Sequence, residues 1–266
     1  MNFLVNLIIK TSVDTLYLTG MIILVGFILG FLREHSIENL QRSFGWKAVA
    51  ITAIVGVPIH EISHAIFCFL FGHKITKVVL IQKRDENGVL GYVKHAYNPN
   101  SVYQQIGNFF IGTAPIFGGI ASIIALMYVI IPKTYNEFIT ISINNLNVTK
   151  LNGIALNGIM TSYVNLIKII FSIKNFTNPY FILFLFLAIC ISSHISLSSA
   201  DIKGASKGLF IIFLIILDLN TLGISRFVMA EDILKYNIVL IGFLIVSLIF
   251  SSITYIVSLL ISLIKI

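Results

Sequence analysis

The chain has 266 residues, of which 57% are hydrophobic and 11% are charged, whereas a soluble domain carries about 25% charged residues. Several apolar runs reach the roughly 18 residues that can cross a bilayer. The sequence therefore predicts a multi-pass integral protein of the cell membrane and excludes a soluble globular domain. The net charge of +7 comes from Lys and Arg scattered singly between these runs, which favours contact with anionic lipid headgroups and argues against a nucleic-acid partner.

The apolar runs predict an all-α membrane protein of about six transmembrane helices. The predicted spans cover residues 16–32, 48–71, 106–131, 180–199, 209–222 and 238–264. Residues 154–173 form a weaker pattern, because Gly, Asn and Lys168 interrupt the apolar positions. That segment is typical of an amphipathic helix at the membrane surface.

A change of pattern separates the second and third predicted spans. Residues 75–82 and 89–97 are rich in β-branched side chains and partly alternate, and Asn87-Gly88 between them is a strong turn signal. The sequence therefore predicts a β-hairpin inserted between the second and third helices. His73 and His95 flank this hairpin. We expect both to be exposed loop histidines, which usually bind no metal.

The second span contains an HExxH motif made of His60, Glu61 and His64. Residues four apart on a helix share a face, so the two histidines can present imidazole nitrogens to one tetrahedral Zn²⁺ with Glu61 beside the open position. Zinc activates a water molecule, and the glutamate can accept its proton and pass it to a leaving amine. Pro58, two residues before His60, predicts a local kink.

The alternative is a His-Glu-His hydrogen-bonded network that only holds helices together. An ionisable group at the centre of a membrane helix costs roughly 2.5 to 3.5 kcal/mol. Ser, Thr and Asn supply interhelical hydrogen bonds at a lower desolvation cost. The metal site is therefore the favoured interpretation of the motif.

A catalytic zinc normally takes a third protein ligand, and two later residues qualify. His194 and Asp201 lie near the end of the fourth predicted span, seven residues apart. They share a face if the helix is continuous. The spacing does not choose between them, and one could bind the metal while the other orients a ligand.

The order of further motifs resembles the site-2 protease family of intramembrane zinc metalloproteases. After the HExxH helix, Gly91, Tyr92 and Val93 are similar to the family's glycine-tyrosine-valine strand. Pro115 and Gly118 fall in a segment similar to its Gly-Pro-x-x-Asn helix start, with glycine in place of the asparagine.

The resemblance also covers residues 199–204, where Asp201 stands in the place of the family's metal-binding aspartate. It implies that Asp201 is the third zinc ligand, with His194 as the alternative ligand or as an orienting residue. We accordingly expect one polytopic domain over residues 1–266, with a catalytic core at about 45–208 and extra helices at 16–32, 209–222 and 238–264.

The resemblance implies a zinc-dependent endopeptidase that cuts transmembrane or membrane-proximal segments of membrane protein substrates. Glu61 is the expected general base, and the expected substrate-binding residues are Gly91, Tyr92, Val93, Pro115 and Gly118. An unwound substrate could add as a β-strand to the hairpin edge at residues 89–97. The alternative is a zinc-binding membrane protein without catalysis, such as a degenerate protease with a chaperone-like role or a metal carrier.

Overall fold

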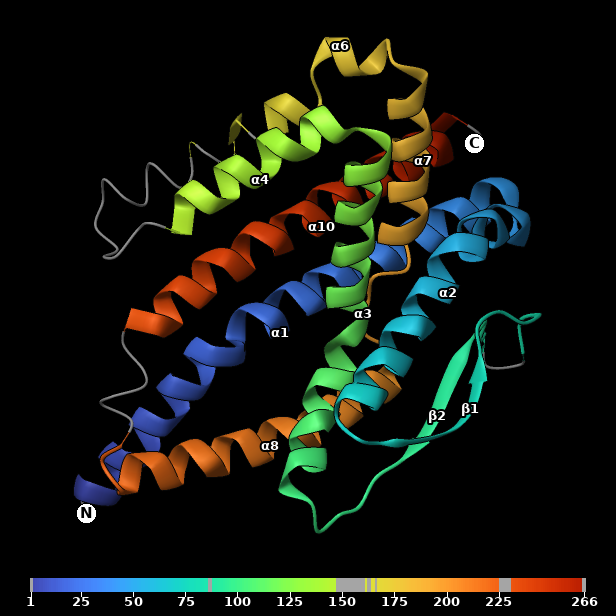
Figure 1. Ribbon diagram of the computed structural model, residues 1–266. Coiled ribbons are helices and arrows are strands. Elements are labelled where there is room, and N and C mark those ends of the chain that lie inside the picture. The colour runs from blue at the N-terminus through green and yellow to red at the C-terminus, as the bar shows by residue number, and fades with distance from the viewer. Residues whose placement is uncertain are drawn as a thin grey trace.

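The computed structural model describes residues 2–85, 88–146, 161, 164–165, 167–224 and 231–264. Within these residues the chain forms eight α-helices and one two-stranded antiparallel hairpin (Figure 1). The elements are α1 (Asn2–Phe44), α2 (Trp46–Leu70), β1 (Lys74–Val79), β2 (Tyr92–Ala96), α3 (Val102–Ile130), α4 (Pro132–Leu146), α6 (Ile173–Phe176), α7 (Pro179–Ser192), α8 (Ser199–Thr221) and α10 (Glu231–Ile264). The predicted hairpin between the second and third helices is confirmed. Most of the amphipathic helix predicted at 154–173 lies outside the described residues.

Four of the described helices are long and apolar enough to cross a membrane, namely Phe3–Phe44, Trp46–Leu70, Val102–Ile130 and Leu240–Ile264. The protein is therefore a multi-pass integral membrane protein. The six predicted spans need correction at the fourth and fifth. The fourth is α7, whose 14 residues extend about 21 Å, less than the roughly 30 Å of a bilayer core. The fifth, at 209–222, is the second half of α8, whose first half carries Asp201, Lys203 and Lys207.

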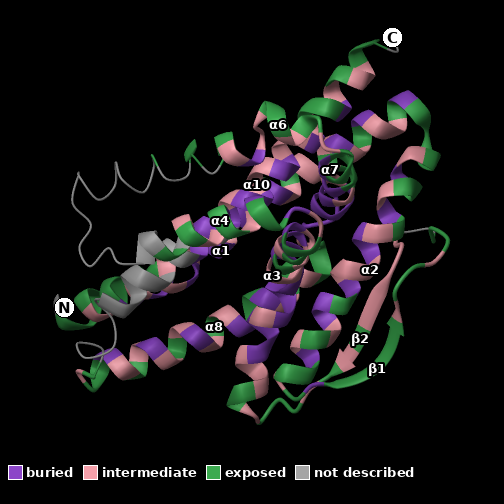
Figure 2. Ribbon diagram, turned by 45° about the horizontal axis from the view of Figure 1, so that its top comes forward, coloured by how far each residue is buried: buried purple, intermediate pink, exposed green. Residues whose placement is uncertain are grey.

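Helix α3 runs through the centre of the protein, with α2 and α8 near one end and α4, α7 and α10 near the other (Figure 1). Ile116, Ile123 and Met127 of α3 are fully buried. Buried residues are concentrated on this helix in Figure 2. The core is therefore built around α3, so the elements that pack on α3 hold fixed positions relative to one another.

The start of α8 packs directly against the middle of α3. A Cβ atom at Gly112 of α3 would lie 2.5 Å from the carbonyl oxygen of Asp201 and 2.9 Å from the backbone nitrogen of Ala205. Gly208, two turns along α8, similarly contacts the backbone of Phe109. Two glycines thus let the helix backbones touch, and this contact fixes the first turn of α8.

The hairpin lies along α2, and β2 is the strand nearer to that helix in both Figure 1 and Figure 2. Val78 pairs with Val93 and Val79 with Tyr92, while an irregularity between Ile75 and Lys77 falls on β1. Because β2 itself is regular, its residues alternate between two faces. The edge of β2 that is not paired with β1 has no strand partner in the sheet, which has two strands among the described residues.

Candidate metal centre

Helix α2 brings the two histidines of the HExxH motif together. His60 and His64 lie one turn apart, and their Nε2 atoms are 3.2 Å from each other. The helix continues through Pro58 from Trp46 to Leu70. The prediction that both histidines share one helix face is therefore confirmed.

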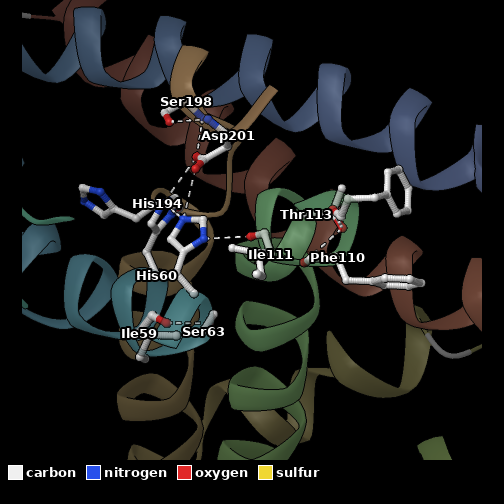
Figure 3. Close-up of polar contacts among 11 residues, drawn as sticks. Ile59, His60, Ser63, Phe110, Ile111, Thr113, His194, Ser198 and Asp201 are labelled. Atoms are coloured by element: carbon white, nitrogen blue, oxygen red, sulfur yellow. Dashed lines mark hydrogen bonds and ion pairs between the residues drawn. The ribbon is translucent and has the colours of Figure 1, made fainter. Parts of the chain in front are cut away.

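Each histidine ring is oriented by a backbone carbonyl. Nδ1 of His64 donates to the carbonyl oxygen of Ile111 at 2.8 Å, and Nδ1 of His60 donates to the carbonyl oxygen of His194 at 3.0 Å (Figure 3). A carbonyl only accepts, so each neutral ring carries its proton on Nδ1 and leaves the Nε2 lone pair free. Metal-binding histidines are commonly held in this way.

The carbonyl that orients His64 is available because of a proline. Pro115 lies inside α3, and proline has no N–H to donate to the carbonyl four residues earlier. That carbonyl belongs to Ile111, the acceptor of the His64 bond. Pro115 therefore frees the group that fixes the tautomer of His64.

Asp201 reaches the site from the first turn of α8. Its Oδ2 accepts from the backbone N–H of Ser198 at 2.7 Å, and its own N–H donates to the Ser198 hydroxyl at 3.2 Å. The same carboxylate lies with Oδ1 3.2 Å from Nε2 of His64 and Oδ2 3.8 Å from Nε2 of His60. The capping box that begins the helix thus also aims Asp201 at both histidines (Figure 3).

The three side chains could hold a metal ion, because their ligand atoms all lie within 4.8 Å of one another. Ligands at about 2.0 to 2.1 Å from a tetrahedral zinc are separated by about 3.3 Å, close to the 3.2 Å from Nε2 of His64 to each partner. When the rings are neutral, only lone pairs converge here, and a cation would remove their repulsion. The side chains of His60, His64 and Asp201 are 15%, 9% and 12% exposed, so the protein alone does not bury them completely.

His194 lies next to the site but contributes its backbone. Its ring Nε2 is 3.2 Å from the hydroxyl of Thr52 on α2, and its carbonyl accepts the His60 bond. The continuous helix that would place His194 and Asp201 on one face does not form, because α7 ends at Ser192 and α8 begins at Ser199. The imidazole of His194 is outside the group of three that could hold a metal.

The hairpin approaches the motif at Glu61. A Cβ atom at Gly91 would lie 2.9 Å from Cγ of Glu61, which is 6% exposed. Gly91 directly precedes β2, and Val93 is the second residue of the strand. Tyr92 is on the face opposite to Val93, where its ring lies beneath Lys77 and Lys94. Of the three residues suggested for substrate binding in this segment, Gly91 is thus placed against Glu61 of the motif.

Pro115 and Gly118 both lie on α3 in the surroundings of the site. Pro115 is buried in α3. A Cβ atom at Gly118 would collide with the side chain of Ser63, the residue before His64. The asparagine that the site-2 protease motif has at this position would not fit at Gly118, because Ser63 occupies the space. Substrate contact by Pro115 and Gly118 stays a prediction.

The expectation that His73 and His95 are exposed loop residues is wrong. His73 is 5% exposed, because it is covered by Tyr97, whose ring stacks on it, and by the start of α3. Its Nδ1 lies 2.9 Å from Nδ1 of His95.

Comparison with protein-family models, curated proteins and solved structures gives no match. The likeness to site-2 proteases therefore depends on the motif residues and their arrangement. Sequence reasoning missed the roles of Ile111 and Ser198. Two signals pointed to them: a proline four residues after Ile111, and a Ser-x-x-Asp capping pattern at 198–201.

Proposed function

We propose that this protein is a membrane-embedded, metal-dependent peptidase in which His60, His64 and Asp201 hold one divalent cation, with zinc as the preferred ion. The observation that carries the proposal is the convergence of three lone-pair donors from α2 and α8 within 4.8 Å. Two nitrogens and one carboxylate oxygen are a donor set that zinc accepts in catalytic sites, where the fourth position stays open.

The residues of the chain then have distinct tasks. The cation, when bound, supplies Lewis-acid polarisation of a water molecule and of the scissile carbonyl. Glu61, next to His60 in the motif, accepts the proton of the attacking water and delivers it to the leaving nitrogen. The unpaired edge of β2 near Gly91 receives an unwound substrate segment as an added strand. Substrates are transmembrane or membrane-proximal segments of other membrane proteins.

The test uses the full-length protein in lipid nanodiscs. Bound metal is quantified, and cleavage is measured on labelled casein, an unfolded chain that needs no helix unwinding, and on a transmembrane-helix reporter. Glu61→Gln keeps the metal and lowers cleavage by roughly 10²-fold or more, the usual effect of losing a general base. Glu137→Gln makes the same chemical change on an exposed residue of α4 and leaves both the bound metal and the cleavage rate unchanged.

Equal cleavage by the wild-type protein and by Glu61→Gln would contradict the peptidase. Full metal occupancy without cleavage by any variant would favour the alternative of a non-catalytic zinc-binding membrane protein. One observation supports that alternative. Gly118 packs closely on Ser63, which leaves no room for the asparagine that the site-2 protease motif has at this position.

A further inference from the structure

One face of the hairpin carries three lysines. Lys77 of β1 lies directly opposite Lys94 of β2, and Lys74 lies opposite Ala96. Because Lys94 and Ala96 are two residues apart on the regular strand β2, these two pairs share a face. The ammonium groups of Lys77 and Lys94 both lie over the ring of Tyr92, 5.5 and 5.3 Å from its centroid. The three lysines, all exposed, form what we call the lysine face.

The lysine face has no counter-charge from the protein. Among the described residues, none of its three lysines has a carboxylate partner. Like charges directly opposite each other on neighbouring strands destabilise the pairing of those strands. An anion placed between Lys77 and Lys94 would remove their repulsion, so this face is suited to a negatively charged ligand.

The lysine face lies where two candidate membrane spans have their ends. Lys74 comes four residues after Leu70, the last residue of α2. The hydroxyl of Tyr103, in the first turn of α3, donates to the Leu70 carbonyl at 2.6 Å. Helices α2 and α3 are both long and apolar enough to cross a membrane. At such ends the apolar core of a bilayer is replaced by phospholipid headgroups, and lysine side chains extend toward that layer.

Exposed apolar side chains follow the lysines toward the tip of the hairpin. These are Leu80 and Ile81. The tip lies at the other end of α2, because the Arg84 guanidinium is 3.7 Å from the centroid of the Trp46 ring at the start of that helix. Charge near the end of two spans, followed by exposed apolar surface, matches the order of phosphate and acyl chains in a phospholipid. A soluble phosphate has no apolar part to place against Leu80 and Ile81.

We propose that the lysine face binds the phosphate of an anionic phospholipid, whose acyl chains contact Leu80 and Ile81. This inference goes beyond the proposed peptidase function and does not depend on it. Lysine binds phosphate as a point charge, and each lysine near an anionic membrane surface contributes about fivefold in affinity. Because the lipid neutralises the repulsion between Lys77 and Lys94, it holds the two strands together more firmly.

The first test measures lipid binding to the full-length protein in detergent by native mass spectrometry, with phosphatidylglycerol or phosphatidylcholine as the probe. The wild-type protein is expected to prefer phosphatidylglycerol. The double variant Lys77→Gln/Lys94→Gln is expected to bind it about 25-fold more weakly at the tightest site. The double variant Lys77→Arg/Lys94→Arg keeps both charges and is expected to bind it as the wild-type protein does.

The matched control is the double variant Lys133→Gln/Lys174→Gln. It removes two exposed lysines near the other end of α3, where the neighbouring residues Thr134 and Asn175 contact each other. This variant is expected to leave the affinity for phosphatidylglycerol at the tightest site unchanged.

The second test measures amide exchange of β2 at constant pH in nanodiscs of either lipid. Exchange in the wild-type protein is expected to be slower in phosphatidylglycerol than in phosphatidylcholine, because the bound lipid removes the repulsion on the lysine face. Exchange in Lys77→Gln/Lys94→Gln is expected to be the same in both bilayers. Unchanged exchange of α3 shows that the double variant is folded.

Equal affinity for phosphatidylglycerol in the wild-type protein and in Lys77→Gln/Lys94→Gln would overturn the inference, and so would equal protection of β2 in the two bilayers. Slower exchange of β2 on addition of inorganic phosphate to phosphatidylcholine nanodiscs would also overturn it, because the lysine face would then bind a soluble anion. Glu61→Gln is expected to behave as the wild-type protein in both tests, so failure of the peptidase proposal leaves this result unaffected.

Discussion

His60 and His64 are set for metal binding by carbonyls that lie outside the regular pattern of helical hydrogen bonds. The carbonyl of Ile111 is released by Pro115, and that of His194 lies in the connection after α7. Loss of such orienting partners commonly costs 10- to 100-fold in metal affinity. The tautomers of both histidines thus depend on backbone geometry more than on neighbouring side chains.

Replacing Pro115 tests this dependence. Pro115→Ala restores an N–H that competes with His64 for the Ile111 carbonyl, so metal affinity is expected to fall by about tenfold. The metal-free protein is expected to become more resistant to unfolding, because an interior proline costs a helix about 3 kcal/mol. Metal titration and thermal unfolding measure the two effects.

Pro132→Ala is the matched control, because Pro132 occupies the first position of α4, where the N–H has no helical partner to bond. Pro132→Ala should leave both the metal affinity and the resistance to thermal unfolding nearly unchanged. Unaltered metal affinity in Pro115→Ala would show that the Ile111 carbonyl does not govern His64.

Asp201 offers a second test at the same scale. Asp201→Asn keeps an oxygen that can accept from the Ser198 N–H, so α8 still begins correctly, but the negative ligand is lost. Metal affinity is expected to fall by more than the 100-fold that an orienting partner costs. Asp218→Asn changes an exposed carboxylate at the far end of the same helix. Equal affinities in the two variants would remove Asp201 from the site.

The sequence was sufficient to predict the site residues that act through their side chains. The HExxH spacing predicted that His60 and His64 share a face, and the resemblance suggested Asp201. The carbonyls of Ile111 and His194 were not predictable, because every residue carries the same carbonyl and only the fold decides which ones are free. His73 was misjudged because its burial depends on α3 and Tyr97, which come later in the chain.

At the scale of elements, the decisive feature is where α8 begins. Asp201 was expected near the end of one helix, but a capping box with Ser198 places it in the first turn of the next. Hydrophobicity alone merged residues 180–199 into one span, because Ile and Leu continue past Ser192 into the connection. The Ser-x-x-Asp pattern was the local signal that could have separated α7 from α8.

The contact between α3 and α8 predicts a second pair of variants. Gly112→Ala would press its methyl group against the backbone at Asp201 and Ala205, displacing the first turn of α8. Overpacking of this kind costs about 1 to 3 kcal/mol, so both stability and metal affinity should fall. Gly204→Ala is the matched control on α8 itself, where no atom lies within 4 Å of the added carbon.

Gly204→Ala should raise stability by up to about 1 kcal/mol through helix propensity and leave metal affinity unchanged. The comparison is made by denaturant unfolding and metal titration. If Gly112→Ala binds metal as tightly as Gly204→Ala, the position of α8 against α3 does not determine the ligand geometry.

The hairpin should be held less firmly in acid. Burial lowers the pKa of His73, and burial together with the His73 and His64 rings lowers the pKa of His95. Protons therefore bind the unfolded pair, with a pKa of about 6.5, more readily than the folded pair. Stability from the pair is present above pH 6.5 or so and is lost as the pH falls from there toward the lowered pKa values.

Amide exchange of β2, corrected for its intrinsic pH dependence, measures the effect. It should be faster at about pH 5.5 than at about pH 7.5, and His73→Gln should reduce the difference. Protection of β2 that is equal at both pH values in the wild-type protein would contradict the account of the pair.

The whole molecule places a polar, metal-ready site among helices that cross a membrane. Helix α1 has 43 residues and is about 64 Å long, so it extends beyond a bilayer core of roughly 30 Å or is strongly tilted. The ligands come from α2, a candidate span, and from α8, which follows the short α7. Asp201 is thus supplied by a helix outside the four candidate spans.

Composition predicted the membrane class, and the change of pattern at residues 75–97 predicted the hairpin. Of the six predicted spans, four correspond to described helices that are long and apolar enough to cross a membrane. Length and charge along single segments do not reveal how α7 and α8 pack against α3.

The central claim is that His60, His64 and Asp201 bind one metal ion. X-ray absorption at the metal edge of the full-length protein in nanodiscs tests it most directly. The account predicts one ion per chain with nitrogen and oxygen neighbours at about 2.0 to 2.1 Å and the outer scattering of two imidazole rings, and this signal is lost in His64→Ala. A metal-free protein, or sulfur neighbours at about 2.3 Å from Cys68 or Cys190, would contradict it.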